Sequence, residues 1–333
     1  MKPTFRDIAA LAGVGTATVE RVLNGRGSVR PETAGKVIAA ARQLNTPRHM
    51  PEAHRGIFRI EVLLLKPGNT FYKRMSRAFE RIAATLDSTV QIQRTYVHPQ
   101  QSQEVARRIL SPDARRAGLI LALPDPAPVR AAVREVAASG LPLVHVVTRA
   151  GDDSGPLIGI DNEAAGRSAG LFMTRMQHRP GPVIAIGDPI YRVHRERLRG
   201  FSQYFDSHQG SGFDFRWAGF GADDPLRIRA VVLDALRLWP DLTGIYNVGA
   251  ANSAVVAALA EAGRAGEVFF AGHELTENST AALKAGHMHI VLDQAPEAQA
   301  RRAVDHLLYQ FGLSKVAPDP TPIRFVTYTD QSV

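Results

Sequence analysis

The spacing of apolar residues changes near residue 57. Before that point, apolar side chains recur at helical spacing in three short stretches, within 5–12, 14–23 and 31–44. After it, short apolar runs alternate with amphipathic stretches, which is the pattern of βαβ units with parallel sheets. We therefore expect a small all-α module followed by a larger α/β body.

The first two stretches predict a pair of helices joined by a tight turn. Thr4 is suited to cap the first helix, and Asp7 three positions later completes a capping-box arrangement. Gly13 lies where that helix must end, so we expect a positive φ there. Pro31 is suited to the first position of a third helix that continues through Leu44. The module is predicted to be a helix-turn-helix, the unit that lays its second helix in the major groove of DNA.

The body is predicted to contain two lobes, because about 270 residues exceed one typical sheet. In such parallel sheets ligands bind at the carboxyl ends of the strands. The expected strands are 60–65, 90–96, 119–123, 143–147, 182–186, 245–248, 269–271 and 290–293, and helices are expected at 78–86, 129–138 and 227–238.

Charge and composition narrow the function. The formal net charge is +8, and the first 60 residues, with ten Lys and Arg against four Asp and Glu, contribute six of that excess. A basic module before a nearly neutral body is typical of a protein whose module meets a polyanion. The 333 residues include no cysteine, which excludes disulfides and thiolate chemistry. Without an apolar run near 18 residues or a signal-like N-terminus, we expect a cytoplasmic protein that does not enter membranes.

The N-terminal motif resembles that of LacI/GalR-family repressors. Its residues are Ile8-Ala9-x-x-Ala12-Gly13-Val14-x-x-x-Thr18-Val19-x-Arg21-Val22-Leu23-Asn24, followed by a helix ending at Leu44-Asn45. The resemblance implies a DNA-binding homodimer switched by a small molecule, with a body of the two-lobed periplasmic-binding-protein type I fold. It divides the chain into a helix-turn-helix domain (1–45), a linker (46–58) and an effector-binding and dimerisation domain (59–333). Lobe one would comprise about 60–161 and 292–320, and lobe two about 162–291 and 321–333.

The second helix is predicted to carry the DNA contacts. Arg21 can bond to guanine O6 and N7, and Thr16 and Ala17 can touch a thymine methyl. Gly15, at the start of the helix, is also expected to lie at the DNA. Contacts to phosphates are expected from four further residues, which are Thr4, Thr18, Asn24 and Arg30. Glu20 stands where the family usually has serine; its carboxylate would repel phosphate but accept from a cytosine amine. A plain three-helix bundle without ligand is the alternative.

The linker departs from the family pattern. The family usually has a hinge helix there, ending in a leucine that enters the minor groove. In 46–56 this leucine is absent, and Pro51 prevents a helix from continuing through it from upstream. Met50 is a candidate substitute for the leucine, and a flexible linker fits the segment equally well.

Residues at the predicted strand ends are candidates for the effector site. After the first strand, Phe71 and Tyr72 can stack on the apolar face of a sugar, or instead pack in the core. Thr148 and Arg149 follow the fourth strand, where sugar binders usually have an acid; Arg149 would suit a carboxylate or phosphate, or lie on the surface. Asp161 is a candidate for both helix capping and the pocket wall.

Four further candidates match family positions in the second half. Arg197 can hold two ligand oxygens, with plain surface charge as the alternative. Asn247 can donate to and accept from hydroxyls. Glu274 replaces the family's aspartate, and Gln294 matches a polar residue on the third crossover. Together they predict a pocket for a sugar, a polyol, or an acidic or phosphorylated derivative.

These features predict a ligand-responsive transcriptional repressor. We find no phosphate-binding P-loop and no Gly-x-Ser-x-Gly motif, so we expect neither enzymatic activity nor a cofactor. His287 and His289 lack an evident third metal ligand, and His273 beside Glu274 is expected to form pocket wall. The alternative class is a sugar-binding component of a transport system, which would have no use for the basic module.

Overall fold

The described residues form two compact units. The residues that this computed structural model describes are 4–24, 29, 31–44, 57–65, 70–98, 100–151 and 154–333. One unit comprises Met1–Arg59 with Leu86–Gln91, and the other comprises Ile60–Thr85 with Ile92–Val333. None of the described helices is long and apolar enough to cross a membrane.

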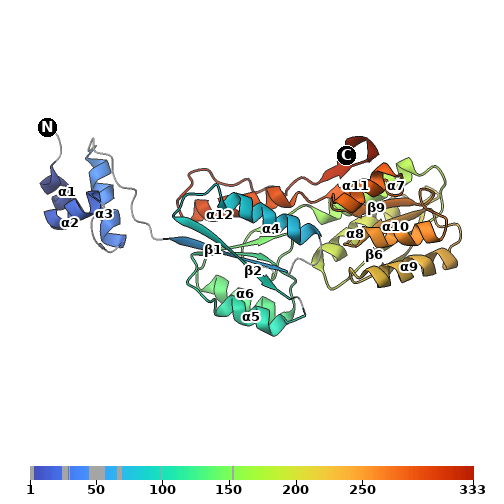
Figure 1. Cartoon of the computed structure of the whole chain (residues 1–333), viewed down its shortest axis with the longest axis horizontal. Helices are drawn as coiled ribbons and strands as arrows, with labels where there is room; N and C mark the ends of the chain where they lie inside the picture. The colour runs from blue at the N-terminus through green and yellow to red at the C-terminus, as the bar shows by residue number, and fades with distance from the viewer. Residues whose placement is uncertain are drawn as a thin grey trace. The chain divides into compact units, whose positions relative to one another are not determined.

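The N-terminal module contains three helices, α1 (Phe5–Ala12), α2 (Thr16–Leu23) and α3 (Pro31–Gln43) (Figure 1). The predicted capping box is confirmed, because the Asp7 amide donates to Thr4 Oγ1 while Thr4 N donates to Asp7 Oδ2 at 2.7 Å. Gly13 ends α1 with φ 65°, as expected. Ile8, Val19 and Val37 are fully buried between the helices, so one small apolar core fixes their arrangement.

Lobe one is a parallel sheet covered on both faces. Helices α5 and α6 lie on one face and α4 and α12 on the other (Figure 1). The strand order is β2-β1-β3-β4-β5. The strands are β1 (Phe58–Leu65), β2 (Val90–Val97), β3 (Gly118–Ala122), β4 (Leu143–Val146) and β5 (Leu157–Ile158). The helices are α4 (Thr70–Ala83), α5 (Ser102–Leu110), α6 (Ala127–Ala138) and α12 (Pro296–Gln310).

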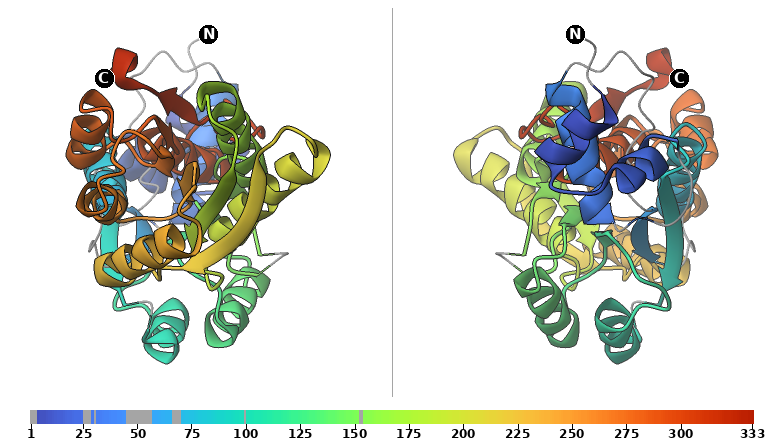
Figure 2. Two further views of the ribbon diagram at one scale, coloured as in Figure 1. Left: turned by 90° about the vertical axis from the view of Figure 1, so that its right-hand side faces the viewer. Right: turned by 90° about the vertical axis from the view of Figure 1, so that its left-hand side faces the viewer.

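Lobe two repeats this layered arrangement with the strand order β11-β10-β9-β8-β6-β7, in which only the β10–β11 pair is antiparallel among the described pairs. Figure 2 shows α9, α10 and α11 on one side of the sheet and α7 and α8 on the other. The strands are β6 (Pro182–Gly187), β7 (Asp214–Phe220), β8 (Gly244–Asn247), β9 (Phe269–His273), β10 (Ile290–Asp293) and β11 (Val326–Tyr328). The helices are α7 (Asn162–Met176), α8 (Arg192–Ser207), α9 (Pro225–Leu238), α10 (Asn252–Glu261) and α11 (Glu277–Lys284), with a final 3-10 turn η1 (Asp330–Ser332).

Helices α7 and α8 approach each other closely because of two glycines. A Cβ at Gly166 would lie 2.1 Å from the Arg197 carbonyl oxygen, and one at Gly200 would lie 2.0 Å from that of Glu163. Only glycine permits this backbone contact. It fixes the part of α8 that carries Arg197 against the first turns of α7.

The chain crosses between the lobes near Ile160, after Asp293, and again before Ile323. Ile160 and Ile323 form a parallel bridge, so two of these segments lie side by side. Strand β10 belongs to the sheet of lobe two, whereas α12, which follows it, packs on α4 in lobe one.

The eight predicted strands are present, but three further strands were not predicted, and the first of the three predicted helices is displaced, whereas the other two begin only two residues earlier than expected. The short strand β5 and the edge strands β7 and β11 escape a search for apolar runs, because β11 is partly exposed and β7 begins with an exposed Asp214. The helix predicted at 78–86 begins at Thr70 and ends at Ala83. Phe71 and Met75 extend the buried stripe of Phe79 and Ile82 toward the N-terminus, which the shorter window missed.

Candidate functional site

The outer face of α2 carries the residues predicted to meet DNA. Thr16, Ala17, Glu20 and Arg21 are exposed, as is Asn24 at the end of the helix, while Thr18 is partly buried. On the inner face, Val19, Val22 and Leu23 pack in the module's core. The sequence therefore divides α2 into a buried apolar face and a solvent-facing face that carries Arg21.

Gly15 and Thr4, both predicted to lie at the DNA, differ in whether their hydrogen-bonding groups are already occupied. Gly15 caps α2 without a side-chain hydrogen bond, so no capping side chain occupies the amides of Thr16 and Ala17, whereas the Thr18 amide donates to the Gly15 carbonyl at 2.9 Å. The Thr4 hydroxyl donates to Asp7 Oδ2 at 2.7 Å, so a phosphate would have to compete with that carboxylate. Arg30 and the linker features at Met50 and Pro51 lie outside the described residues.

A cavity of about 100 Å³ lies between the lobes. Lobe one contributes Leu65, Phe71, Tyr72 and Val147 to its lining, and the crossover after β10 contributes Gln294. Lobe two contributes the rest of the lining, which is Tyr191, Val193, His194, Arg197, Asp223, Gly249, Ala250, His273 and Glu274. Five predicted effector residues are thus brought together: Phe71, Tyr72, Arg197, Glu274 and Gln294. The rings of Phe71 and Tyr72 meet edge to face with centroids 5.2 Å apart.

Arg197 is the buried cation of the cavity. Its side chain is held by Nε donating to Asn162 Oδ1 at 2.9 Å and Nη1 donating to the Val248 carbonyl at 2.6 Å. Its Nη2 is buried and makes no hydrogen bond with the described part of the chain. With Arg197 only 2% exposed, the surface-charge alternative is wrong, and one guanidinium nitrogen remains to bind a ligand oxygen.

Glu274 brings a carboxyl group to the same cavity. The Gln294 amide donates to Glu274 Oε1, whereas Oε2 is buried and accepts no hydrogen bond from the described residues. Burial, and then the neighbouring Asp293, raise the pKa of Glu274 to about 8. The left-handed backbone of Glu274 (φ 70°) is a strained conformation for a residue with a side chain.

Two histidines in the wall are neutral near pH 7. Burial and the charge of Arg197 lower the pKa of His194 to about 3 and that of His273 well below its ordinary value. The Asp188 amide donates to His194 Nδ1 at 3.1 Å, which places the proton of the neutral ring on Nε2. His273 Nε2 is 2.7 Å from the Tyr246 hydroxyl, and its Nδ1 is buried with no hydrogen bond from the described residues. The expectation that His273 forms pocket wall is confirmed.

We expect Glu274→Gln to remove part of the pH dependence of stability. The pKa of Glu274 is higher in the folded chain than its ordinary 4.5, so unfolding releases a proton and stability falls as pH rises toward about 8. Urea unfolding at pH 7 and pH 8.5 should show a loss of about 1 kcal/mol in the wild type that is absent in the variant. His194 and His273 stay neutral in the folded chain over this range, and their contribution is common to the wild type and the variant.

Glu277→Gln is the matched control, because Glu277 is exposed on the neighbouring helix. It should keep the slope of the wild type. An unchanged slope in Glu274→Gln would contradict the raised pKa.

Four predicted effector residues do not line the cavity. The left-handed backbone of Val147 (φ 68°) makes Val147 the lining residue after β4, while Thr148 is buried elsewhere and Arg149 lies outside the lining. Asp161 accepts from the Ala164 amide at 2.8 Å and caps α7, as its alternative proposed. Asn247 is buried behind the cavity, where its amide donates to the Ala250 carbonyl at 2.7 Å.

Sequence reasoning missed Asp223, Tyr191 and His194. Asp223 Oδ1 accepts from the Ala250 amide at 2.8 Å, and burial raises the pKa of this carboxyl. Its positive φ of 53° follows that of Ala222 at 49°, directly after an edge strand that the apolar pattern did not reveal. A correct placement of β7 would have identified Asp223 as a strand-end residue.

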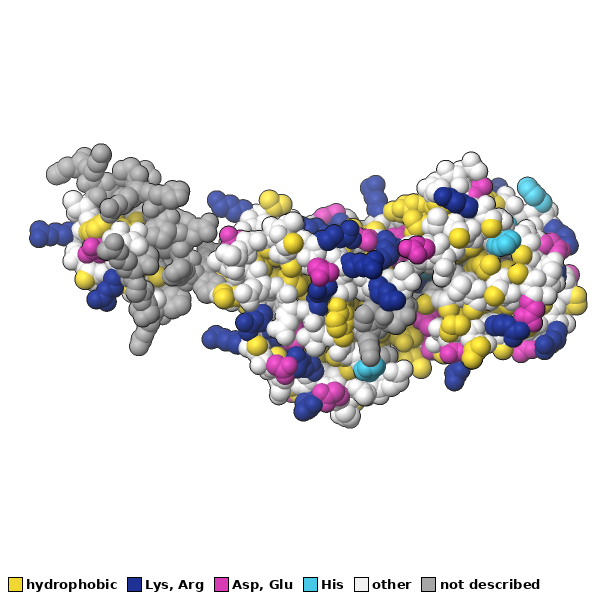
Figure 3. Space-filling model, viewed as in Figure 1, with side chains coloured by type: hydrophobic (Ala, Val, Ile, Leu, Met, Phe, Trp, Pro, Cys, Tyr) yellow, Lys and Arg dark blue, Asp and Glu magenta, His cyan; other side chains and the backbone are white. Residues whose placement is uncertain are grey.

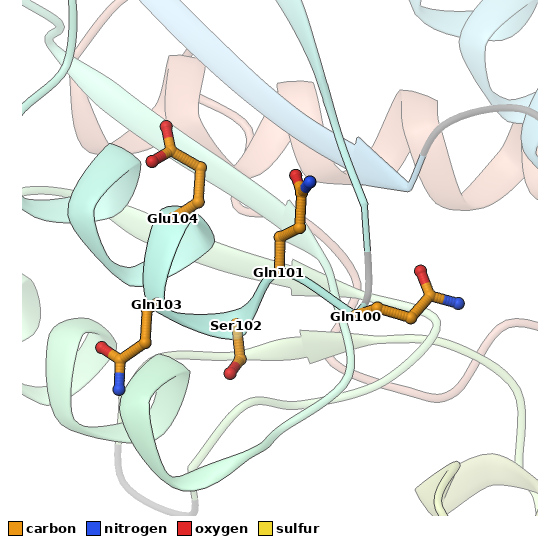
Figure 4. Close-up of a pocket in the computed structure, with 5 residues that line it drawn as sticks. All are labelled: Gln100, Gln101, Ser102, Gln103 and Glu104. Carbon is orange, nitrogen blue, oxygen red and sulfur yellow. The ribbon is translucent and has the colours of Figure 1, made fainter.

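A larger hollow of about 630 Å³ lies at the start of α5, lined by Gln100, Gln101, Ser102, Gln103 and Glu104 (Figure 4). These side chains come from one segment and point in different directions in Figure 4. The charged member, Glu104, is paired with Arg107 at 2.6 Å. We regard this hollow as an open surface depression. Among the residues that the structure describes, no group of three His, Cys, Asp or Glu is placed to hold a metal ion.

Solved structures support the fold of the body. An ABC-transporter solute-binding protein from Burkholderia graminis, in complex with D-arabinose, superposes with a TM-score of 0.74 at 20% identity, covering 85% of this chain and 98% of that one. An Actinobacillus succinogenes periplasmic solute-binding protein with bound D-allose gives a TM-score of 0.72 at 18% identity, covering 82% and 98%. At this level of identity the likeness shows the fold alone.

Sequence comparison connects both parts of the chain to known families. Residues 60–311 match the model of the periplasmic binding protein domain, and residues 4–46 match that of bacterial regulatory proteins of the lacI family. Catabolite control protein A of Staphylococcus epidermidis is 26% identical over 216 residues, which is 63% of each chain. The predicted family and fold class are confirmed: the chain belongs to the LacI family, with a helix-turn-helix module and a periplasmic-binding-protein body.

Proposed function

We propose that this chain is a transcriptional repressor whose operator affinity is set by a small polyhydroxylated effector bound between the lobes. The observation that carries the proposal is the occurrence, in one chain, of an exposed recognition face on α2 and a buried polar cavity between two lobes. It acts by binding and not as an enzyme. The helix-turn-helix, for which a transport component has no use, favours this function over sugar transport.

The donors and acceptors in the cavity favour a neutral sugar or polyol. Arg197 Nη2 requires an acceptor, and the Glu274 carboxyl, mostly protonated near pH 7, can donate or accept; a hydroxyl group can also be either. Phe71 and Tyr72 supply apolar surface beside them. Arg149, which suggested an acidic or phosphorylated ligand, does not line the cavity, whereas the acidic side chain of Asp223 does.

The cavity volume implies that binding is coupled to lobe movement. About 100 Å³ is well below the roughly 300–1,000 Å³ of most ligand sites. A sugar-sized molecule therefore requires the lobes to separate before they close on it. A two-fold dimer in the cytoplasm would convert that movement into a change in the spacing of two DNA-binding modules on a symmetric operator.

A thermal-shift panel tests the effector class. We would compare D-ribose, D-arabinose, D-allose and sucrose with ribose 5-phosphate and glucose 6-phosphate. The expected result is that at least one neutral sugar raises the melting temperature by several degrees and changes operator binding in a gel shift, since a bound ligand stabilises the folded state. Stabilisation by the phosphorylated sugars alone would contradict the neutral-effector proposal.

A further inference from the structure

One guanidinium, that of Arg74, joins the two lobes beside the cavity. Arg74 lies on α4 in lobe one and is fixed there by Glu297 of α12, with Nε 3.2 Å from Oε1 and Nη2 2.9 Å from Oε2. The same group donates to Asp293 Oδ2 at 2.5 Å and Oδ1 at 3.3 Å, and to the Leu275 carbonyl at 3.1 Å. Asp293 and Leu275 belong to lobe two, so three of these five hydrogen bonds cross the boundary between the lobes.

The Asp293 carboxylate organises the crossover that Arg74 binds. It accepts from the Leu275 amide at 2.8 Å and from the Ala295 amide at 2.9 Å, in addition to the two bonds from Arg74. Ala295 begins α12 in a left-handed conformation (φ 51°), which is costly unless its neighbours hold it. Asp293 is therefore the point where β10 of lobe two is tied to both α4 and the start of α12.

This cluster continues directly into the effector cavity. Gln294, between Asp293 and Ala295, donates its amide to Glu274 Oε1. Arg74 Nη1 lies 3.7 Å from Glu274 Oε2, the oxygen that accepts no hydrogen bond from the described residues. Arg74 is thus the cation that lobe one brings to Glu274, while Arg197 and the like-charged Asp293 act on it from lobe two.

We infer that Arg74 is a positioning residue that holds the Asp293 crossover and aims Glu274 Oε2 into the cavity, so that lobe closure and effector binding share one contact. Without its guanidinium, the carboxylates of Asp293 and Glu297 lose the cation between them, and the Glu274 carboxyl loses its neighbour in lobe one. An effector donor that draws Glu274 Oε2 away from Arg74 changes the same cluster that ties the lobes together. Lysine cannot replace the planar group, because it cannot pair with two carboxylates through two parallel bonds each.

The neighbouring cations of α4 do not share this arrangement. Figure 3 shows Lys and Arg side chains gathered over lobe one, and Lys73, Arg77 and Arg81 of α4 are exposed. Arg81 reaches Glu297 only at 4.0 Å, and its side chain is 70% exposed against 23% for Arg74. Arg81→Gln removes the same charge from the same helix and serves as the matched control.

Lobe distances measured without effector test the inference. The chain has no cysteine, so spin labels can be attached at Ala131→Cys on α6 and Ala230→Cys on α9, both exposed alanines. Pulsed electron resonance should give one narrow distance distribution for the parent and for Arg81→Gln. We expect a broader, longer distribution for Arg74→Gln, and an intermediate one for Arg74→Lys. A distribution for Arg74→Gln equal to that of the parent would overturn the inference.

The pH dependence of stability distinguishes a positioning role of Arg74 from a purely structural one. Removal of Arg74 takes away a charge that lowers the pKa of Glu274, so the pH at which the stability slope ends should move upward in Arg74→Gln and stay in place in Arg81→Gln. If Arg74→Gln does not fold, Asp293→Asn, which weakens the bonds that cross to lobe two while Arg74 keeps those to Glu297, should broaden the lobe distance in its place, and an unchanged distance overturns the inference.

The inference rests on the proposed function only in taking the cavity as the effector site. Neither the lobe distance nor the pH dependence of stability requires an effector to be measured. The inference about Arg74 therefore does not depend on the outcome of the sugar panel, and unchanged lobe distances reject it even if a sugar binds.

Discussion

A chain lacking residues 1–45 is expected to lose specific DNA binding by at least about a thousand-fold, while the effector domain stays folded. Specific complexes are typically 10³–10⁷ times tighter than non-specific ones, and this chain concentrates its basic excess and its exposed recognition face in the deleted part. A gel shift with the region upstream of its own gene, repeated at 50 and 200 mM salt, measures the loss. The full chain should show steep salt dependence, because bound Lys and Arg displace counterions.

Point substitutions in the intact chain separate base contacts from phosphate contacts. Arg21→Ala should cost roughly 1–3 kcal/mol at one base pair and relax sequence preference there. Arg227→Ala removes the same charge from an exposed position on α9 and should change neither quantity. Equal losses on specific and random DNA would make Arg21 a phosphate contact, and specific binding retained by the deletion would refute the assignment of the module.

Local signals made the N-terminal module predictable. The capping box at Thr4 and Asp7, the left-handed Gly13 and the start of α3 at Pro31 each depend on residues within three or four positions of one another. Such features are decided by backbone conformation and by side chains nearby in sequence, so they can be read without knowledge of the tertiary fold. The same holds for the division of α2 into buried valines and an exposed Arg21.

The cavity was only partly predictable, for reasons that lie in the backbone. The end of the first strand indicated Phe71, and the family resemblance indicated Arg197 and Glu274; all three line the cavity. Thr148 failed because the left-handed Val147 reverses which residue faces the cavity, and no pattern of apolar residues encodes that reversal. Asp223 was missed because its position depends on an edge strand and on a hydrogen bond from Ala250, 27 residues later.

Arg197→Ala is expected to shift the effector response to much higher effector concentrations while leaving operator binding intact. The structure shows a guanidinium fixed by Asn162 and the Val248 carbonyl, with Nη2 left to meet the ligand. A hydrogen bond from a charged group contributes about 1.5–3 kcal/mol, so its loss weakens effector binding by roughly 10- to 150-fold. The measurement is the effector concentration that half-maximally changes operator affinity.

Arg199→Ala is the control that makes this result specific. Arg199 lies two residues further along α8, is exposed and pairs with Glu163 at 2.7 Å, so its removal takes the same charge from the same helix without opening the cavity. Arg197→Lys adds a second comparison, since it keeps a cation but cannot make the fixed contacts and the ligand contact together. If Arg197→Ala responds at the effector concentration of the wild type, the effector binds elsewhere, because no other buried guanidinium lines the cavity among the residues that the structure describes.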